Sequence, residues 1–401
     1  MRVNGMGRLR VGLAVIGLFG LLSCAPERAP EIDRGMALEP VAFADLADWP
    51  GTAPSAGLKA FVAGCGRIEK ADPSAQFGGK SFAGIIAAWQ DACSVARSTP
   101  PGDDAAARLF FEENFRPFAI TQDGEPDGLI TGYYEPLLNG SPTPTARFRV
   151  PLHARPVDLV SVDLGEFSPD LQGRRIAGKV VDGKLTLYPD RAAIDSGVLA
   201  SQQLELLWVD DPVAKFFLQI QGSGRVRLPD GSVQRVGYAD QNGRLYRPIG
   251  RDLVQAGEIS QDQISLQTIR AWLEAHPERA DELMWKNPSY VFFRTLPDLA
   301  DDQGAPGALG IPLTAGHSLA VDRSFWPLGA PMWLDTSYPP EVGGAPLRTV
   351  AVAQDTGGAI KGAVRADLFV GVGPPAERIA GPMKSGGRLW ILLPNGIQPV
   401  G

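Results

Sequence analysis

Apolar residues recur at two different spacings along the chain, and the changes of spacing divide it into sections. Three or four positions separate many apolar residues between about 58 and 115, which is the period of a helix face. Ser81 is expected to be the N-cap of one such helix. The apolar face of that helix would carry Phe82, Ile85, Ile86, Trp89 and Cys93.

A second helical section is predicted from Ser260, where Gln263 completes a capping box. Its apolar residues include Leu266, Ile269 and Leu273, and it is expected to stop near His276-Pro277 before a shorter helix through Leu283.

Between these helical sections, from about 129 to 246, the pattern is that of strands and tight turns. Asp182-Gly183 and Asp230-Gly231 each predict a hairpin. Residues 216–223 alternate, and we expect a strand there whose polar face carries Gln219, Gln221 and Ser223. The order of helices, strands, helices and strands predicts a mainly β fold with helical sections, of the α+β class.

Composition is ordinary for a globular protein, with 401 residues, 44% hydrophobic and 21% charged, and the length allows two or three domains. The formal charge is −7, and it becomes −10 without the arginines at positions 2, 8 and 10. An acidic body of this kind argues against nucleic acid as a partner.

The first residues predict export. Three arginines precede an apolar run from Val11 to Leu22, which is too short to span a membrane and has the length of a signal-peptide core. It ends in Leu-Leu-Ser-Cys, which resembles the bacterial lipoprotein box. We expect a signal peptide over 1–23, lipidation of Cys24 and a Pro-rich tether over 24–48, with a plain secretory signal as the alternative. Ala25 after the cysteine favours the outer membrane.

Two cysteines remain after the leader, Cys65 and Cys93. In an oxidising compartment such a pair is first interpreted as a disulfide, and each lies on the apolar face of a predicted helix. Two buried thiols are the alternative.

Several kinds of chemistry find little support. His153, His276 and His317 are isolated from one another and from metal-ligand spacings, so no metal and no cofactor are expected. Asp195-Ser196-Gly197 and Asp355-Thr356-Gly357 resemble the halves of an aspartic protease dyad, but neither glycine is followed by Ser or Thr. Cleavage of a glycosidic bond fits better, because it needs a carboxylic acid beside a groove with aromatic and amide groups. Tyr133, Tyr134, Gln219, Gln221 and Ser223 are the candidates to line that groove.

Four sequence blocks together resemble the membrane-bound lytic murein transglycosylase A family, and they occur in the family's order. They are Thr131–Pro136, Phe217–Gly224, Asn287–Phe293 and residues 355–373, and they cover about residues 45 to 396. The lipoprotein leader adds to the resemblance. It implies a double-psi β-barrel formed by residues 49–134 and 247–401, interrupted by an inserted β-domain at 135–246, with a glycan groove between the two. The C-terminal part resembles the three-aspartate domain, whose acidic positions fall on Asp322, Asp355 and Asp367.

The resemblance also implies a reaction. Lytic transglycosylases cut the β-1,4 bond between N-acetylmuramic acid and N-acetylglucosamine without water and leave a 1,6-anhydromuramyl end. The family's single acid/base corresponds to Asp367, and Asp355 is expected to stay charged beside it, with Lys361 or the amides near Gly357-Gly358 as partners. A purely structural Asp355 is the alternative. Thr131 and Lys361 join the expected substrate-binding residues, and Glu135 is interpreted as a polar residue at the groove edge.

Two other functions stay open from the sequence. One is a hydrolase in which Asp367 acts with Glu135 or Asp322 as a carboxylate pair, and the other is a glycan-binding lipoprotein without catalysis. The expected partners are peptidoglycan glycan strands and the membrane through Cys24, with cell-wall synthesis or division proteins also possible. The expected location is the periplasmic face of the outer membrane.

Overall fold

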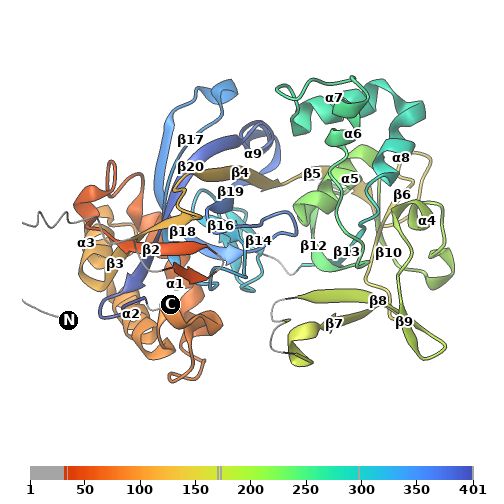
Figure 1. Cartoon of the computed structure of the whole chain (residues 1–401). Helices are drawn as coiled ribbons and strands as arrows, with labels where there is room; N and C mark the ends of the chain where they lie inside the picture. The colour runs from red at the N-terminus through yellow and green to blue at the C-terminus, as the bar shows by residue number, and fades with distance from the viewer. Residues whose placement is uncertain (1–30, 34, 169–170, 172–173, 297–298, 400–401) are drawn as a thin grey trace, which may run out of the picture.

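The structure is a computed structural model that describes residues 31–33, 35–168, 171, 174–296 and 299–399. The predicted signal peptide and Cys24 lie outside these residues. Figure 1 shows two bodies side by side, which we call the barrel body and the insert body, and strand β4 leads from the first toward the second. No helix among the described residues has the length and apolar character that a bilayer span requires.

The barrel body is built on one large sheet. Within the described residues, its nine strands follow the order β1-β2-β3-β20-β17-β18-β16-β19-β4, and an extra pairing of β20 with β4 closes six of them into a barrel. The barrel strands are β4 (Gly128–Glu135), β16 (Ser318–Val321), β17 (Pro331–Ser337), β18 (Pro346–Asp355), β19 (Arg365–Val372) and β20 (Lys384–Pro394). The expected mainly β fold with a barrel is therefore confirmed.

Three further strands extend the barrel sheet: β1 (Glu31–Asp33), β2 (Met36–Pro40) and β3 (Phe115–Gln122). Strand β2 lies in the stretch expected to be a tether, yet it pairs antiparallel with β3. Met36 and Leu38 are buried there, and this apolar burial explains why the segment joins the fold.

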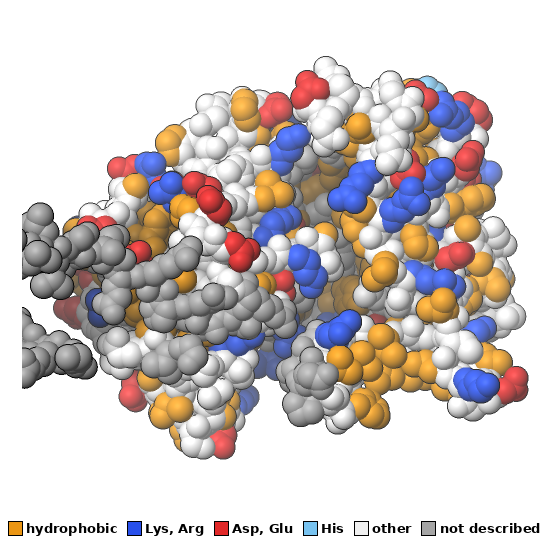
Figure 2. All heavy atoms as spheres, viewed as in Figure 1, with side chains coloured by type: hydrophobic (Ala, Val, Ile, Leu, Met, Phe, Trp, Pro, Cys, Tyr) orange, Lys and Arg blue, Asp and Glu red, His pale blue; other side chains and the backbone are white. Residues whose placement is uncertain are grey.

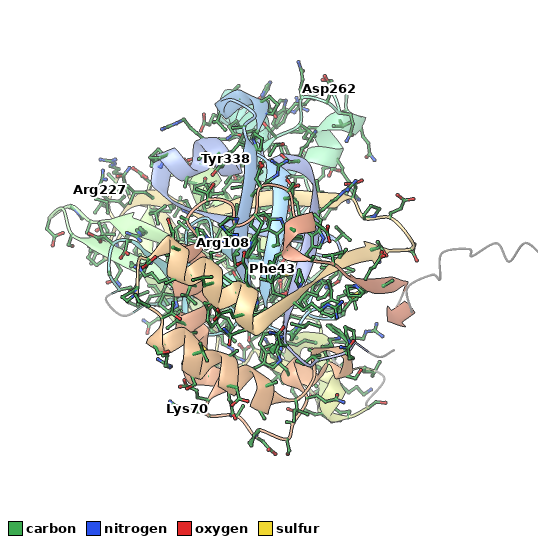
Figure 3. All side chains as sticks on the ribbon, turned by 90° about the vertical axis from the view of Figure 1, so that its left-hand side faces the viewer. Phe43, Lys70, Arg108, Arg227, Asp262 and Tyr338 are labelled. Atoms are coloured by element: carbon green, nitrogen blue, oxygen red, sulfur yellow. A yellow bond between two sulfur atoms is a disulfide. The ribbon has the colours of Figure 1, made fainter. Side chains whose placement is uncertain are left out.

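Helices α1 (Pro54–Ile68), α2 (Ile86–Ser98) and α3 (Asp104–Asn114) cover one side of the sheet. Figure 3 views this layer from outside, with Arg108 marking α3 and the strands behind the helices. Helix α2 begins at Ile86 rather than after Ser81, because Gly84 between them has φ of 68° and takes the backbone out of the helix. Helix α9 (Gly373–Ala380) follows β19 and contacts β4.

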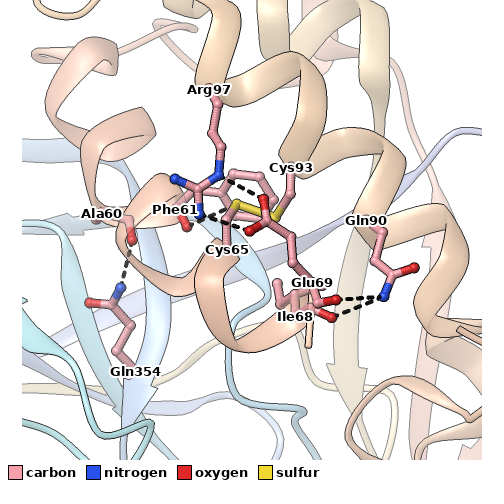
Figure 4. Close-up of a disulfide and its surroundings, with 9 residues drawn as sticks. All are labelled: Ala60, Phe61, Cys65, Ile68, Glu69, Gln90, Cys93, Arg97 and Gln354. Carbon is pink, nitrogen blue, oxygen red and sulfur yellow. Dashed lines mark hydrogen bonds and ion pairs between the residues drawn. A yellow bond between two sulfur atoms is a disulfide. The ribbon is translucent and has the colours of Figure 1, made fainter. Parts of the chain in front are cut away.

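Cys65 of α1 and Cys93 of α2 form a disulfide, as expected for a cysteine pair in an oxidising compartment (Figure 4). Both are fully buried. Beside them the side chain of Gln354, from β18, donates to the backbone oxygen of Ala60 in α1 over 2.7 Å. The two disulfide-bonded helices are thus connected by a hydrogen bond to the strand that ends at Asp355.

The insert body has its own sheet, with strand order β13-β12-β11-β5-β10-β6 in the described part of the chain. These strands are β5 (Leu137–Ser141), β6 (Val150–His153), β10 (Glu205–Val209), β11 (Ser223–Arg227), β12 (Val233–Gln241) and β13 (Val291–Thr295). A smaller sheet holds β7 (Val160–Asp163), β8 (Arg175–Val181) and β9 (Lys184–Thr186). Both predicted hairpins are present, as β8–β9 and β11–β12.

Five helices described in this body pack against its sheet or one another: α4 (Arg191–Asp195), α5 (Pro212–Gln221), α6 (Gly250–Gln255), α7 (Leu266–Ala275) and α8 (Pro277–Trp285). Apolar side chains of α5 to α8 share one core cluster, and β13 pairs with β12. The insert body therefore continues well past residue 246, where its end was expected. A short pair, β14 (Gln303–Pro306) and β15 (Pro312–Thr314), leads back to the barrel.

The expected strand over residues 216–223 is wrong, because most of it belongs to helix α5. Asp211 caps the helix by accepting from Val213 N, Pro212 occupies the first turn, and Gly222 ends it with φ of 80°. Phe216, Phe217 and Leu218 are all buried, so this helix has apolar contacts on more than one face. The second helical section also starts later than predicted. Helix α7 begins at Leu266, and its capping box is formed by Ser265 rather than by Ser260.

Loss of the disulfide should destabilise the barrel body. The bond closes a loop with a sequence separation of 28, for which chain entropy alone gives about 3–4 kcal/mol. We expect the double variant Cys65→Ala/Cys93→Ala to unfold at clearly lower denaturant than the unaltered protein. Reduction should lower the stability of the unaltered protein and leave the variant unchanged. Equal stability of the two oxidised proteins would contradict the prediction.

Candidate active site

Asp367 is the third residue of β19, which pairs with β4 on one side and with β16 on the other. The parallel register sets Asp367 opposite Thr131, and the Thr131 hydroxyl donates to Oδ1 of Asp367 over 2.6 Å. The same hydroxyl accepts from Nη2 of Arg365 over 2.9 Å. Because a hydroxyl has one proton to donate, the arginine directs it toward the carboxyl group.

The surroundings of Asp367 favour its protonated form. Burial raises the pKa of Asp367 to about 6, and the Asp355 carboxylate acts in the same direction. The hydrogen bond from Thr131 and the positive charge of Arg365 oppose this rise. A carboxyl group with such a pKa can both give and take a proton near neutral pH.

Asp355 ends β18 and accepts hydrogen bonds from other segments. Its Oδ2 accepts from the Tyr133 hydroxyl over 2.9 Å, and its Oδ1 accepts from Ala308 N over 2.9 Å. Burial raises the pKa of Asp355, while the backbone N–H groups of Thr356 and Ala308 and the Tyr133 hydroxyl stabilise its charged form. The expected partnership with Lys361 is absent from the ion pairs of the described residues. The Lys361 side chain is 72% exposed, and its Nζ lies 3.9 Å from Asp322.

Asp322 holds the loop between β18 and β19. Its Oδ1 accepts from the backbone and hydroxyl of Ser324, and its Oδ2 accepts from Gly362 N over 3.0 Å. Burial alone would raise the pKa of Asp322, but these hydrogen bonds outweigh it and lower the pKa. The buried, charged Asp322 therefore anchors the loop that leads to Asp367.

The two tyrosines of the expected groove have different surroundings. Tyr133 points at Asp355, and its ring lies 5.4 Å from that of Phe369. Tyr134 points the opposite way from the same strand and is buried against Ala376 and Ala380 of α9. Tyr134 was therefore a wrong choice for a groove residue, because neighbouring residues of a strand face opposite sides.

The expected amide face of residues 216–223 is also not formed, because these residues are helical. Gln219 is buried, accepts from Arg191 and donates to Val291 O over 3.1 Å, so it binds α5 to β13. Gln221 accepts from Tyr134 N over 3.0 Å and thereby joins α5 to β4. Ser223 is half-buried at the start of β11.

Glu135 does not lie at a groove edge. It is fully buried between Arg235 and Arg225, at 3.0 and 3.4 Å. Burial raises the pKa of Glu135, and the two arginines act against it. Both arginines also donate to the backbone oxygen of Gln303. Glu135 and Asp322 are thus both occupied by internal partners, which removes the two proposed partners for a carboxylate pair with Asp367.

Arg365 was not singled out from the sequence, although its position offered a signal. It stands two residues before Asp367 in the same strand, so the two side chains share a face. No group of three or more His, Cys, Asp or Glu side chains suited to a metal ion occurs in the ranges that the structure describes.

Comparisons with known proteins agree with this arrangement. A family model described as "MltA specific insert domain" matches residues 129–294, and one described as "3D domain" matches 317–393, a range that contains all three aspartates. A solved structure of a membrane-bound lytic murein transglycosylase from Agrobacterium tumefaciens is 34% identical with a TM-score of 0.77, and the match covers 89% of this chain and 97% of that one. The chain belongs to the MltA family.

Other MltA relatives show similar coverage by structure and less by sequence. The Escherichia coli K12 protein "Membrane-bound lytic murein transglycosylase A" is 33% identical over 270 residues, which are 66% of this chain and 65% of that relative. The crystal structure of E. coli MltA with bound chitohexaose is 25% identical with a TM-score of 0.65, covering 92% of this chain and 97% of that chain. The insert model ends at 294, which agrees with the end of β13.

Removal of the Thr131 hydroxyl should change the titration of Asp367. The hydroxyl stabilises the carboxylate, so Thr131→Val should raise the pKa of Asp367 above its value of about 6. Carbon-13 NMR of labelled aspartate carboxyl groups would measure this. Thr336→Val is a matched control, because Thr336 donates to Gly386 O elsewhere in the barrel body. An unchanged or lower pKa in Thr131→Val would contradict the assigned hydrogen bond.

Proposed function

We propose that this protein is a peptidoglycan lytic transglycosylase that cleaves the bond between N-acetylmuramic acid and N-acetylglucosamine and forms a 1,6-anhydromuramyl end. The proposal rests on the Asp367 carboxyl group, which has a pKa of about 6, while Glu135 and Asp322 are held by partners within the protein and Asp355 accepts from Tyr133 and Ala308. Its chemistry suits a reaction in which one group serves as acid and then as base.

The proton balance needs one carboxyl group. Protonated Asp367 gives its proton to the glycosidic oxygen as the C1–O bond breaks, and the glucosamine hydroxyl leaves. The C6 hydroxyl of the muramyl residue attacks C1, and the Asp367 carboxylate takes its proton. Asp367 is then protonated again, and no water is consumed. A hydrolase would instead need a second carboxylate to activate water or to attack C1.

Asp355 has a supporting part in this proposal. It accepts from Tyr133 and Ala308, which favours its charged form, and this charge raises the pKa of Asp367. A negative charge beside the reaction centre would also stabilise the positive charge that develops on the sugar ring. Asp355 is therefore proposed as an electrostatic aid to catalysis rather than a proton carrier.

The substrate is proposed to lie between the barrel and insert bodies. Figure 2 shows a hollow there, with lysine and arginine side chains along its edges. The similar E. coli MltA was solved with bound chitohexaose, a β-1,4 glycan, which supports a glycan substrate for this chain. Thr131, Tyr133, Ser223 and Lys361 remain proposed contacts to it. The buried side chains of Tyr134 and Gln219 do not, and neither does Gln221, whose side-chain oxygen accepts from Tyr134 N.

The location is proposed from the leader. Lipidation of Cys24 would hold the protein at the periplasmic face of the outer membrane. With β1 starting at residue 31, only about seven residues would separate the lipid from the fold, or roughly 25 Å when extended. The relatives are named membrane-bound, which supports an anchored protein.

Replacement of the acid/base should abolish the reaction without unfolding the protein. Asp367→Asn is expected to melt like the unaltered protein and to release at least about a thousandfold less anhydromuropeptide from murein sacculi, since the proton donor is lost. Asp127→Asn, at an exposed ion pair on the barrel, is the matched control and should stay active. Mass spectrometry decides the reaction type, because a hydrolase product carries one additional water. A folded, active Asp367→Asn protein would refute the assignment.

Activity should fall as the pH rises through the pKa of Asp367. The acid must begin protonated, so the rate is highest below a pH of about 6 and declines above it. In Asp355→Asn the neighbouring charge is gone, so the pKa of Asp367 should decrease and the alkaline limb of the pH profile should move to lower pH. A shift to higher pH, or none, would contradict the proposed coupling. Thermal melting of the variant would identify a merely structural loss.

A further inference from the structure

A second cavity lies in the insert body, away from the proposed glycan groove. Its volume is about 360 Å³, and its walls come from α4, α5, α8, β6 and β10. Figure 1 places α4, α8, β6 and β10 on the side of the insert body that faces away from β19, whereas α5 lies nearer to β4. The cavity is therefore separate from Asp367 and has no part in the proposed cleavage.

Charged side chains are buried at the floor of this cavity. The Lys215 side chain is 6% exposed, and its Nζ lies 2.8 Å from Oδ1 of Asp195. Arg191 is 2% exposed, and the hydrogen bonds of its guanidinium go to Gln219 and to the backbone oxygens of Asn287 and Ser289. Among the described groups at the floor, the two buried cations Lys215 and Arg191 are therefore accompanied by one carboxylate, that of Asp195. Burial of charge is costly, and this excess positive charge favours an anionic ligand.

His153 adds no charge to the floor at neutral pH. Its Nδ1 is 2.7 Å from the hydroxyl of Tyr290, whose ring lies 5.0 Å from the Lys215 ammonium. Burial lowers the pKa of His153 to about 4, and the nearby Lys215 acts in the same direction. The positive charge at the floor comes from Lys215 and Arg191.

The rim has a different character. Trp208 and Trp285 offer aromatic surface, and Glu205 and Asp281 place two carboxylates there beside the cation Arg149. The cavity thus presents positive charge at its base and carboxylates with aromatic rings nearer its mouth. One wall is β6, the last strand in the order of its sheet.

We propose that this cavity binds the zwitterionic end of a short peptide. The carboxylate of the peptide would lie at the floor near Lys215 and Arg191, and its ammonium group near Glu205 and Asp281. If the proposed function holds, the peptide is the stem that peptidoglycan carries. Binding of this stem in the cavity would keep the attached, uncleaved glycan on the protein. Only the source of the peptide rests on the proposed function.

Calorimetric titration of the full Asp367→Asn protein tests this directly. The probe is a tripeptide ending in meso-diaminopimelate, which carries an ammonium and a carboxylate on one terminal carbon. The same peptide with that carboxylate as a carboxamide should bind at least about tenfold weaker, because a charge-assisted hydrogen bond is lost. Acetylation of the terminal ammonium should also weaken binding. Absence of saturable binding, or equal affinity for the acid and the amide, would overturn the proposal.

Variants show whether the peptide occupies this cavity. Lys215→Met should bind the tripeptide with the terminal carboxylate no more tightly than the carboxamide form. If this variant does not fold, the rim variants Trp285→Ala and Asp281→Asn provide the test. Trp285 is 37% exposed and Asp281 is exposed, so neither change should unfold the protein. Asp281→Asn should abolish the difference in affinity between the peptide with a free terminal ammonium and the peptide with that group acetylated. Asp127→Asn is the matched control. Unchanged affinity in both rim variants would mean binding elsewhere and would refute the site.

The two proposals fail in different ways. Trp285→Ala should cleave glycan strands stripped of peptide at the unaltered rate and should release products from peptide-bearing sacculi more slowly. If the unaltered protein forms no anhydro products but binds the tripeptide as described, the lytic function is wrong and the cavity assignment stands. If it forms products and binds no peptide, the cavity assignment alone is wrong.

Discussion

The pairing of β19 between β4 and β16 is the constraint on which the candidate site depends. It places Asp367 beside Thr131 although the two are 236 positions apart in the chain, and it closes the barrel that buries the carboxyl group. Burial is also the main cause of the raised pKa of Asp367. One feature of the topology therefore supplies both the position and the proton affinity of the proposed acid/base.

The neighbouring strand is held from the opposite side by the helices. Gln354, one residue before Asp355, is fully buried, donates to Ala60 of α1 and accepts from the Ser318 hydroxyl. Helix α1 is in turn stapled to α2 by the Cys65–Cys93 bond. Asp322 holds the loop that follows β18 by accepting from Gly362. The two aspartates near the proposed reaction centre are thus fixed by separate supports, which preserves their relative position as the substrate enters.

Buried charges have different tasks in the two bodies. Near the barrel, Glu135 pairs with Arg225 and Arg235, and this cluster connects the end of β4 to the chain that returns through Gln303. In the insert body, Lys215 and Arg191 lie near the single carboxylate of Asp195. Each cluster thus sets two cations against one carboxylate, but Lys215 and Arg191 line a cavity of about 360 Å³, whereas Glu135 is fully buried with its two arginines around it. The access to a cavity is the physical reason for treating Glu135 as structural and the cavity as a binding site.

The sequence was enough to predict the features that depend on local chemistry or on distinctive blocks of residues. These include the disulfide pair, both hairpins at Asp-Gly turns, the mainly β class and the family to which the chain is similar. It could not locate the end of the insert body, because α6 to α8 have ordinary helical patterns that fit either body until their shared core is seen.

The direction of each side chain at the site followed from the packing of the folded chain and could not be predicted from the sequence. Tyr133 and Tyr134 are adjacent and chemically alike, yet one contacts Asp355 and the other packs under α9. The residues from Phe216 onward fitted the pattern of a strand because helix α5 is buried on more than one side. Only the packing of this segment in the fold showed that it is a helix. Likewise, Glu135 was expected at a groove edge and is buried against arginines, whereas Lys361 was expected beside Asp355 and is exposed near Asp322. Burial and ion-pair partners come from segments far away in the chain, so the sequence did not indicate them.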